Sequence, residues 1–483
     1  MRTPSPAPRR LPGPALAVSC AALILAGCAG GITPTVALSS PSNTMVQSPM
    51  VSTTTQAATR TNTSTPLPTF TPSPTPEHDV IVVDAAQSLG EISPLVYGSN
   101  VGPWQSITKA DVGRIKEARL TIFRYPGGSY VDENSFSQTD LDEFIRLCRE
   151  TDAEPMVQVK LVNATPESAA KVVQYANITK GYGIKYWSIG NEPSLYLSQR
   201  NIAHYDSAAF NAQWREFALA MKAVDPTILL LGPETHQYTG LKGDAILDIH
   251  SKDWMKEFLV ANGDLVDIVS FHRYPFGNFD PFINELLKSS QEWDCIIPNL
   301  RQLIQATTGR DIPIAVTEVN SNWSNRSREE TTPDTLLNAI WWADSLGRMI
   351  EQHVAIVNQF AVDGSGGWAL LGSQEPRPAY YVYLIYGEFG NQLLFSSSGI
   401  ENISAYAARK TDGSLTVILI NRSSNPRQVK MDLRNFTPKG SASLRLLDAD
   451  HQAAEMPSLP ISGSSSLSLP ELSVSLVLIP AAD

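Results

Sequence analysis

A regular alternation of strand-like and helix-like segments runs through the middle of the chain and restricts the folds it can adopt. Eight apolar, β-type segments end at turn or polar residues, at 94–100, 120–128, 154–162, 184–193, 227–236, 266–276, 312–320 and 354–362. Helix-like segments separate them, for example 139–151, 208–224 and 335–352. Because strands that alternate with helices form parallel sheets, these units predict an α/β fold, a closed (β/α)8 TIM barrel.

The pattern changes after residue 376. Short β-type runs with turn residues between them fill the rest of the chain, which is typical of an all-β sandwich. We therefore predict a barrel domain at 78–376 and a C-terminal β-sandwich domain at 377–483. An apolar strand at 79–83 precedes the barrel, and we hypothesise that it pairs into the sandwich.

The N-terminal residues have the pattern of a targeting segment. Three arginines precede an apolar run at 15–26 that is too short to span a bilayer as a mature helix, and Cys28 follows it. This pattern resembles a bacterial lipoprotein signal, which is cut before a cysteine that then carries lipid. We predict a signal peptide at 1–27 and lipidation of Cys28. An ordinary secretory signal with an incidental cysteine is the alternative.

The segment 28–77 is predicted to be a linker. Serine, threonine and proline make up more than half of residues 31–77, and this composition cannot bury a hydrophobic core. Together with the lipid site, the linker predicts an extracytoplasmic, cell-surface lipoprotein anchored to the bacterial membrane. The lipid anchor would be the only contact with the membrane.

Charge and missing motifs exclude several classes of function. The formal net charge of −11 argues against nucleic acid as a partner. Cys148 and Cys295 lack the spacing of metal ligands. The sequence has no Gly-x-Ser-x-Gly elbow and no His-Glu-x-x-His site, which disfavours serine esterases and zinc proteases. We expect neither a metal nor an organic cofactor.

Two glutamates follow strands on opposite sides of the predicted barrel. Active sites of TIM barrels lie at the carboxyl ends of the strands, where Glu192 follows the fourth strand and Glu318 ends the seventh. Strands 4 and 7 face each other across the mouth. Two carboxyl groups about 5–5.5 Å apart suit glycoside hydrolysis with retention, in which one is the nucleophile and the other the acid and base. Glu234, at the end of the fifth strand, is the rival nucleophile.

Other polar and aromatic residues at strand ends have candidate binding roles. Arg124 can hold the nucleophile ionised, Tyr274 can donate a hydrogen bond to it, and Asn191 can bind a sugar hydroxyl. His272 is either a buried structural histidine or a sugar contact. We expect the two nearby carboxylates to raise the pKa of one of them. Three tryptophans that follow strands are candidates to stack on sugars: Trp104, Trp323 and Trp368.

The motifs that carry these residues resemble the retaining glycoside hydrolases of clan A. The segments FRYPGG, IKYWSIGNEP, FHRYPF and IAVTEVN are similar to those of the α-L-arabinofuranosidase family, glycoside hydrolase family 51. The resemblance covers about residues 79–480. It implies that Glu192 after Asn191 is the acid and base, that Glu318 is the nucleophile, and that Arg124 and Tyr274 support it.

Two departures from that family leave alternatives open. Ser99-Asn100 stands where the family has a glutamate, and Thr317-Glu318-Val319 stands where it usually has Asp-Glu-Trp. We predict a retaining, arabinofuranosidase-like glycoside hydrolase acting on plant-type polysaccharide or oligosaccharide by double displacement. An endo-glucanase, xylanase or β-xylosidase of the same clan is the alternative enzyme. A non-catalytic sugar-binding lipoprotein is the alternative of another class.

Overall fold

The computed structural model describes residues 77–372 and 375–482. The predicted signal peptide, the predicted lipid site at Cys28 and the linker up to residue 76 lie outside the described residues. Within the described residues, no helix combines the length and the apolar character needed to cross a membrane.

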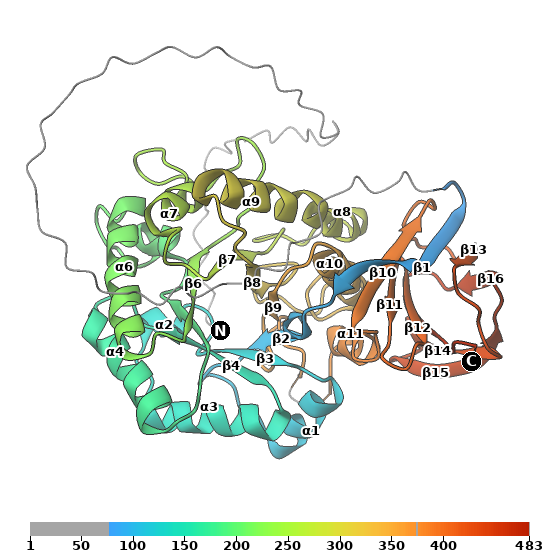
Figure 1. Ribbon diagram of the computed structural model, residues 1–483, viewed down its shortest axis with the longest axis horizontal. Coiled ribbons are helices and arrows are strands. Elements are labelled where there is room, and N and C mark those ends of the chain that lie inside the picture. Colours follow the sequence, from blue (N-terminus) through green and yellow to red (C-terminus); the bar gives the residue numbers. More distant parts are fainter. Residues whose placement is uncertain (1–76, 373–374, 483) are drawn as a thin grey trace, which may run out of the picture. The chain divides into compact units, whose positions relative to one another are not determined.

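Eight parallel strands close into a barrel in chain order, as the alternating pattern predicted (Figure 1). The first and last strands complete the ring, because Gly98 in the first pairs with Asn358 in the last. The strands are β2 (Gly98–Asn100), β3 (Ile122–Tyr125), β4 (Glu154–Val159), β5 (Tyr186–Ile189), β6 (Leu229–Thr235), β7 (Ile268–Arg273), β8 (Ile314–Val319) and β9 (Ile356–Gln359).

Helices surround the barrel. Several of them begin after a residue whose side chain caps the helix N-terminus. Thr108, Ser137 and Thr165 each accept a hydrogen bond from the third residue of the helix that follows, which satisfies an amide with no partner inside the helix. The main helices are α1 (Lys109–Glu117), α3 (Gln138–Thr151), α4 (Pro166–Val173), α6 (Ser207–Val224), α7 (Trp254–Asn262), α8 (Ile283–Ser289), α9 (Trp293–Thr308), α10 (Leu336–Glu351) and α11 (Pro378–Tyr386). Two short helices, α2 (Tyr130–Glu133) and α5 (Tyr196–Gln199), follow barrel strands.

A nine-stranded sheet forms the second folded part of the molecule, so the fold class predicted from the sequence is confirmed. Apolar residues from eight of its nine strands pack into one core, which gives the sheet the character of a sandwich. Its strand order is β15-β14-β17-β12-β11-β10-β1-β13-β16. The strands are β1 (Val80–Glu91), β10 (Gln392–Ser398), β11 (Ile403–Arg409), β12 (Leu415–Asn421), β13 (Arg427–Arg434), β14 (Ser441–Leu447), β15 (Ala454–Pro460), β16 (Ser464–Leu469) and β17 (Ser473–Ile479).

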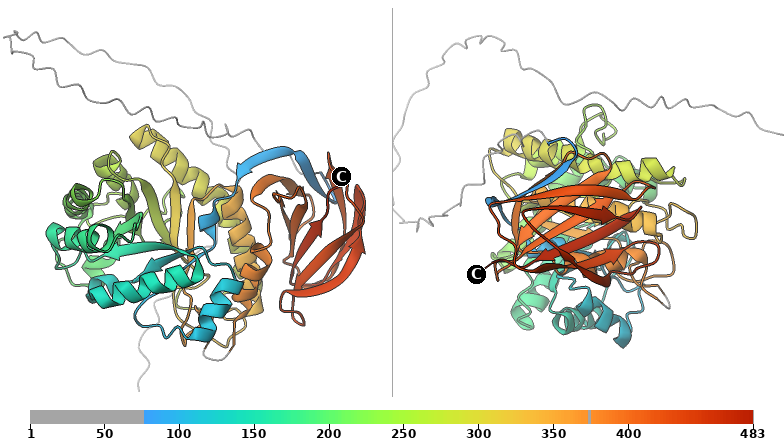
Figure 2. Two further views of the ribbon diagram at one scale, coloured as in Figure 1. Left: turned by 60° about the horizontal axis from the view of Figure 1, so that its bottom comes forward. Right: turned by 90° about the vertical axis from the view of Figure 1, so that its right-hand side faces the viewer.

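The N-terminal strand β1 lies inside this C-terminal sheet. It pairs antiparallel with β10 and parallel with β13, and Figure 2 shows it in blue among orange and red strands. The helix α11 lies after the domain boundary predicted at residue 376, but it packs against the barrel helix α10. The chain therefore enters through the sheet, completes the barrel and returns to the sheet.

A buried ionic cluster, which we call the junction cluster, joins α10 to the sheet. Asp344 is fully buried and receives hydrogen bonds from Ser290 Oγ at 2.6 Å and Tyr406 Oη at 2.7 Å. Arg348 Nε lies 3.0 Å and Arg422 Nε 3.5 Å from its carboxylate. Burial favours the neutral acid, but the two arginines lower the pKa of Asp344 below its usual value, so the group stays ionised.

Candidate active site

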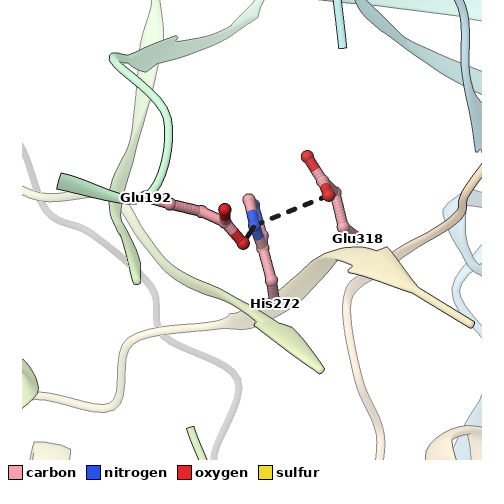
Figure 3. Close-up of side chains that lie close together, drawn as sticks. All are labelled: Glu192, His272 and Glu318. Carbon is pink, nitrogen blue, oxygen red and sulfur yellow. Dashed lines mark hydrogen bonds and ion pairs between the residues drawn. The ribbon is translucent and has the colours of Figure 1, made fainter. Parts of the chain in front are cut away.

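Glu192, His272 and Glu318 meet at the carboxyl ends of the barrel strands. They come from the turn after β5, from β7 and from β8, and Figure 3 shows the three side chains turned toward one another. A carboxylate oxygen of each glutamate and a ring nitrogen of the histidine all lie within 4.8 Å of one another. The two glutamates predicted from strand ends are thus brought together.

Arg124 organises the floor of the site from a fully buried position on β3. One terminal nitrogen donates to Glu318 Oε1 at 2.8 Å and to Asn100 Oδ1 at 2.9 Å. The other donates to Glu234 Oε2 at 2.7 Å and to Asn191 Oδ1 at 2.8 Å. Because the guanidinium is planar and always charged, it sets the positions of these groups and offsets two buried carboxylates.

Both oxygens of Glu318 have protein donors. Arg124 holds Oε1, and the Tyr274 hydroxyl donates to Oε2 at 2.8 Å. An apolar wall of Tyr274, Phe360 and Ala361, with Trp368 packed on it, lies beside them. The carboxylate is therefore oriented and stabilised as an anion, as a nucleophile requires.

Glu192 is the most accessible of the three clustered glutamates. Its side chain is 17% exposed, against 6% for Glu318 and 0% for Glu234. Its backbone has a left-handed conformation, with φ of 47°, and its amide donates to the carbonyl of Glu234 at 3.1 Å. Left-handed backbone is uncommon for a residue other than glycine, and here it changes the direction of the chain at the end of β5. The strand-to-turn break after β5 thus turns this carboxylate into the mouth.

His272 lies between the carboxylates and is fully buried. Its Nδ1 is 3.0 Å from Glu192 Oε1 and 3.7 Å from Glu318 Oε2, and its Nε2 is 3.1 Å from Glu234 Oε2. Burial opposes a charge on the ring, but the surrounding carboxylates raise the pKa of His272 to about 9. The ring is therefore protonated on both nitrogens, and positively charged, at neutral pH.

This histidine corrects the expectation for the glutamates. We expected repulsion between the two anions to raise the pKa of one of them. Burial acts on Glu192 in that direction, but the hydrogen bond and charge of His272 lower the pKa of Glu192 below its usual value. The proton that the site holds at rest is thus on His272 rather than on Glu192. The spacing of residues along the sequence does not show that this ring is buried or that a carboxylate contacts each of its nitrogens.

Glu234, the rival nucleophile, lies below the other two carboxylates. It is fully buried and accepts hydrogen bonds from Arg124 and, at 3.0 Å, from Thr317 Oγ1. Burial would favour its neutral form, but Arg124 and His272 lower the pKa of Glu234 to about 2. A carboxylate that is ionised and closed off in this way anchors Arg124 and His272, and it is not exposed to a substrate.

The predicted tryptophans occupy two different places. Trp368 packs edge-on against Phe360, with ring centroids 5.2 Å apart, and Trp104 lies nearly parallel to the same ring at 6.3 Å. A side-chain carbon added to Gly128 would be 3.2 Å from Phe360 and 3.9 Å from Glu318, so this aromatic group borders the carboxylate. Trp323 instead packs against the loop at Gly277 and is 45% exposed.

The spacing of Glu192, His272 and Glu318 would also suit a metal ion. However, Arg124 and Tyr274 already bind the two oxygens of Glu318, and His272 has a carboxylate at each nitrogen. The arrangement is therefore better suited to moving a proton between neighbouring groups than to coordinating a cation.

Comparisons with known proteins confirm the resemblance to α-L-arabinofuranosidases. The chain is 25% identical to the intracellular exo-α-(1→5)-L-arabinofuranosidase 1 of Bacillus subtilis over 276 residues, 46% of this chain and 53% of that protein. It is 23% identical to heparanase of Rattus norvegicus over 270 residues, 52% of this chain and 47% of that protein. The chain thus spans about half the length of the curated relatives it matches.

Solved structures with the same fold cover most of the chain. The α-L-arabinofuranosidase of Thermotoga maritima has a TM-score of 0.67 at 18% identity, over 83% of this chain and 99% of that one. CelM2, a bifunctional glucanase-xylanase from a metagenome library, has the same score and coverages at 19% identity. Within the sheet, residues 401–470 match the family profile of the D-apionate lactonase C-terminal immunoglobulin-like domain.

The predicted localisation is wrong by these comparisons. Three bacterial relatives, from Bacillus subtilis, Halalkalibacterium halodurans and Acetivibrio thermocellus, are named intracellular arabinofuranosidases. They contradict the prediction of an extracytoplasmic, cell-surface lipoprotein. That prediction rested on a short N-terminal pattern of arginines, apolar residues and one cysteine, which is much less specific than the spacing of eight strands.

Proposed function

We propose that this protein is a retaining glycoside hydrolase of arabinofuranosidase type, with Glu318 as nucleophile and Glu192 as acid and base. The observation that carries the proposal is the approach of the two glutamates, whose oxygens come within 4.8 Å of each other. Retaining enzymes keep their two carboxyl groups about 5–5.5 Å apart, whereas inverting enzymes need about 6.5–9.5 Å to admit a water between them.

In the first step, Glu318 attacks the anomeric carbon and the glycosidic C–O bond breaks. The electron pair of that bond goes to the leaving oxygen, which takes a proton from Glu192. Arg124 and Tyr274 keep Glu318 ionised and aimed until the new bond forms. Asn191, which precedes Glu192, and Trp368, which packs on Phe360 near Glu318, are the proposed contacts for the sugar.

His272 supplies the proton that Glu192 donates. At rest the histidine is charged and Glu192 is ionised, with 3.0 Å between Nδ1 and Oε1. As the bond from Glu318 to the anomeric carbon forms, Glu318 loses its charge, and the attraction that holds the proton on His272 weakens within the same step. The proton then passes along the hydrogen bond to Glu192 and on to the leaving oxygen.

The second step reverses these transfers. Water attacks the anomeric carbon, Glu192 accepts a proton from it, and the bond to Glu318 breaks with its electron pair returning to the carboxylate. The charge restored on Glu318 draws the proton back to His272. The site therefore ends in its initial state.

The proposed substrate is a plant-type polysaccharide or oligosaccharide that carries α-L-arabinofuranosyl units, as the names of several relatives suggest. A glucanase or xylanase activity is the second candidate. It is favoured by the structure of CelM2, which matches this fold with the same TM-score as the arabinofuranosidase of Thermotoga maritima.

The test is hydrolysis of an aryl α-L-arabinofuranoside by the full chain, with Glu318→Ala as the control. We expect turnover by the unmodified protein, loss of turnover in the variant, and arabinose released first as the α-anomer by NMR. Release of the opposite anomer would overturn the retaining mechanism. Hydrolysis of xylan or β-glucan without any arabinofuranoside turnover would favour the second candidate.

A further inference from the structure

A buried acid outside the catalytic cluster connects the loops that shape it. Asp132 lies in α2 and is 4% exposed. Its Oδ1 accepts hydrogen bonds from the amides of Leu161 at 3.0 Å and Val162 at 3.3 Å. Its Oδ2 accepts from the amide of Asn191 at 2.8 Å and from the Tyr196 hydroxyl. One carboxylate thus ties together the segments that follow β3, β4 and β5.

These contacts converge on the residue that precedes Glu192. The Tyr196 hydroxyl also accepts from the Asn191 amide at 3.3 Å, so Asp132 and Tyr196 hold that amide together. The hydroxyl leaves no room for a side chain at Gly190, where an added carbon would lie 2.6 Å from it at a φ of +72°. Gly190, Asn191 and Glu192 are therefore held in one conformation.

The partners of Asp132 set it apart from the other buried acids. Its hydrogen-bond donors are three backbone amides and a phenol, all neutral, whereas Glu234 and Asp344 contact arginine. Burial raises the pKa of Asp132, and the hydrogen bonds from Tyr196 and the amides offset that rise only in part. A buried carboxylate without a counter-charge is unfavourable for stability, so its value lies in the geometry it enforces.

We propose that Asp132 is a positioning residue for the proton donor: with Tyr196 it holds the Asn191 amide and so fixes Glu192 against His272 and across from Glu318. This inference rests on the proposed function. It requires that a change at Asp132 impair the protonation of the leaving group while the attack by Glu318, held separately by Arg124 and Tyr274, continues.

Substrates with different leaving groups separate an effect on leaving-group protonation from an effect on the attack by Glu318. A phenyl α-L-arabinofuranoside needs a proton on its departing oxygen, whereas a 2,4-dinitrophenyl α-L-arabinofuranoside departs without one. General acid catalysis contributes about 10²–10⁴-fold. We expect Asp132→Asn to lower kcat/KM for the phenyl substrate by about 100-fold and for the dinitrophenyl substrate by less than about 10-fold.

Two further variants keep the test decisive. Tyr196→Phe removes only the hydroxyl and keeps the ring beside Tyr205, whose centroid is 5.1 Å away, so it reports even if Asp132→Asn does not fold. We expect the same selectivity with a smaller loss. The control is Asp142→Asn on the outer helix α3, where Asp142 accepts from the phenols of Tyr175 at 2.9 Å and Tyr182 at 2.6 Å and pairs with Lys180 at 2.8 Å. It should leave both substrates unaffected.

Equal losses on the two substrates, or the same selectivity in Asp142→Asn, would overturn the inference. A readout independent of turnover is the titration of His272, followed by NMR with labelled histidine. Displacing Glu192 removes a contact that raises the pKa of His272, so Asp132→Asn should lower that pKa. If no arabinofuranoside is hydrolysed by the unmodified protein, the proposed function fails, but an unchanged His272 titration is what would overturn the role of Asp132.

Discussion

The catalytic cluster and the junction cluster are both buried groups of acids and cations, yet they are balanced differently. In the junction cluster, Asp344 contacts two arginines, Arg348 and Arg422, whose charges do not change with pH. In the catalytic cluster, three glutamates share one arginine and one histidine. The first cluster has a single charge state over the physiological range, while the second contains a group that can gain or lose a proton.

Burial therefore serves two purposes in one molecule. Permanent cations around a buried acid produce a rigid connection, because removal of Asp344 leaves the buried Arg422 without its acidic partner. A histidine among carboxylates produces a site whose proton can move, because each transfer changes the field that held it.

Glu318→Ala should abolish activity without destabilising the fold. We expect kcat/KM for an aryl arabinofuranoside to fall by at least about 10⁴-fold, as for other catalytic nucleophiles. The free energy of unfolding should change by less than about 1 kcal/mol, because two glutamates still balance Arg124 and His272. Kinetics and urea unfolding of the same preparation measure both. A destabilised variant would show that the catalytic cluster is mainly structural.

Asp344→Asn should have the opposite profile. Loss of the anion leaves Arg422 without its partner, so we expect a loss of about 3–5 kcal/mol in the free energy of unfolding. The kcat of the folded variant at 25 °C should equal that of the unmodified protein. In the unmodified protein, the depressed pKa of Asp344 means that its stabilisation is present above pH 3.8 and is lost as the pH falls further. The variant should lack this acid sensitivity.

His272→Gln should remove a sensitivity at the other end of the pH scale. The pKa of His272 is raised from 6.5 to about 9, so its stabilisation is present below pH 6.5 and is lost as the pH rises through 9. This contribution is on the order of 3 kcal/mol. Urea unfolding at pH 6.5 and pH 9 should show that slope in the unmodified protein and a smaller one in the variant. An identical slope in both would argue against a charged His272.

The smallest effect is expected from an ion pair on the surface. Arg215 makes a two-pronged contact with Asp264, at 2.8 and 2.7 Å, but the side chains are 39% and 65% exposed. Arg215→Ala should change the free energy of unfolding by less than about 1 kcal/mol and leave activity unaltered. A loss as large as that of Asp344→Asn would show that burial is not what distinguishes the junction cluster.

The barrel was predictable because its signal repeats. Each unit has its own apolar run and its own turn, and together they establish the register of strand ends where Glu192 and Glu318 lie. Detail within one unit is less predictable. The sequence predicts one strand over 94–100, but this segment contains a short 3-10 helix, Pro94–Val96, before β2. Pro94 and the cap formed by Ser93 favour that local turn over extended backbone.

The contacts within the site were not predictable, because they depend on how deeply each side chain is buried. Glu192 and Glu234 both lie at the carboxyl ends of strands, but they differ in exposure and in the partners that surround each carboxylate. His272 was equally compatible with a structural or a binding role. Asp132 lies in a four-residue helix, and no periodic signal marks an acid whose partners are three amides from the segments after β4 and β5. Such contacts between distant segments exist only once the barrel has closed.

The placement of β1 in the C-terminal sheet determines how the molecule can be divided. Ile81 pairs with Ser398 and, on its other side, with Met431. During synthesis, β1 leaves the ribosome long before β10 and β13. It can pair with them only after the whole barrel has been made. A fragment that begins after the barrel would lack a central strand and expose two unpaired edges, which favours aggregation. Strands from both ends of the folded chain complete the sheet. It is therefore not a module that can be moved to another protein.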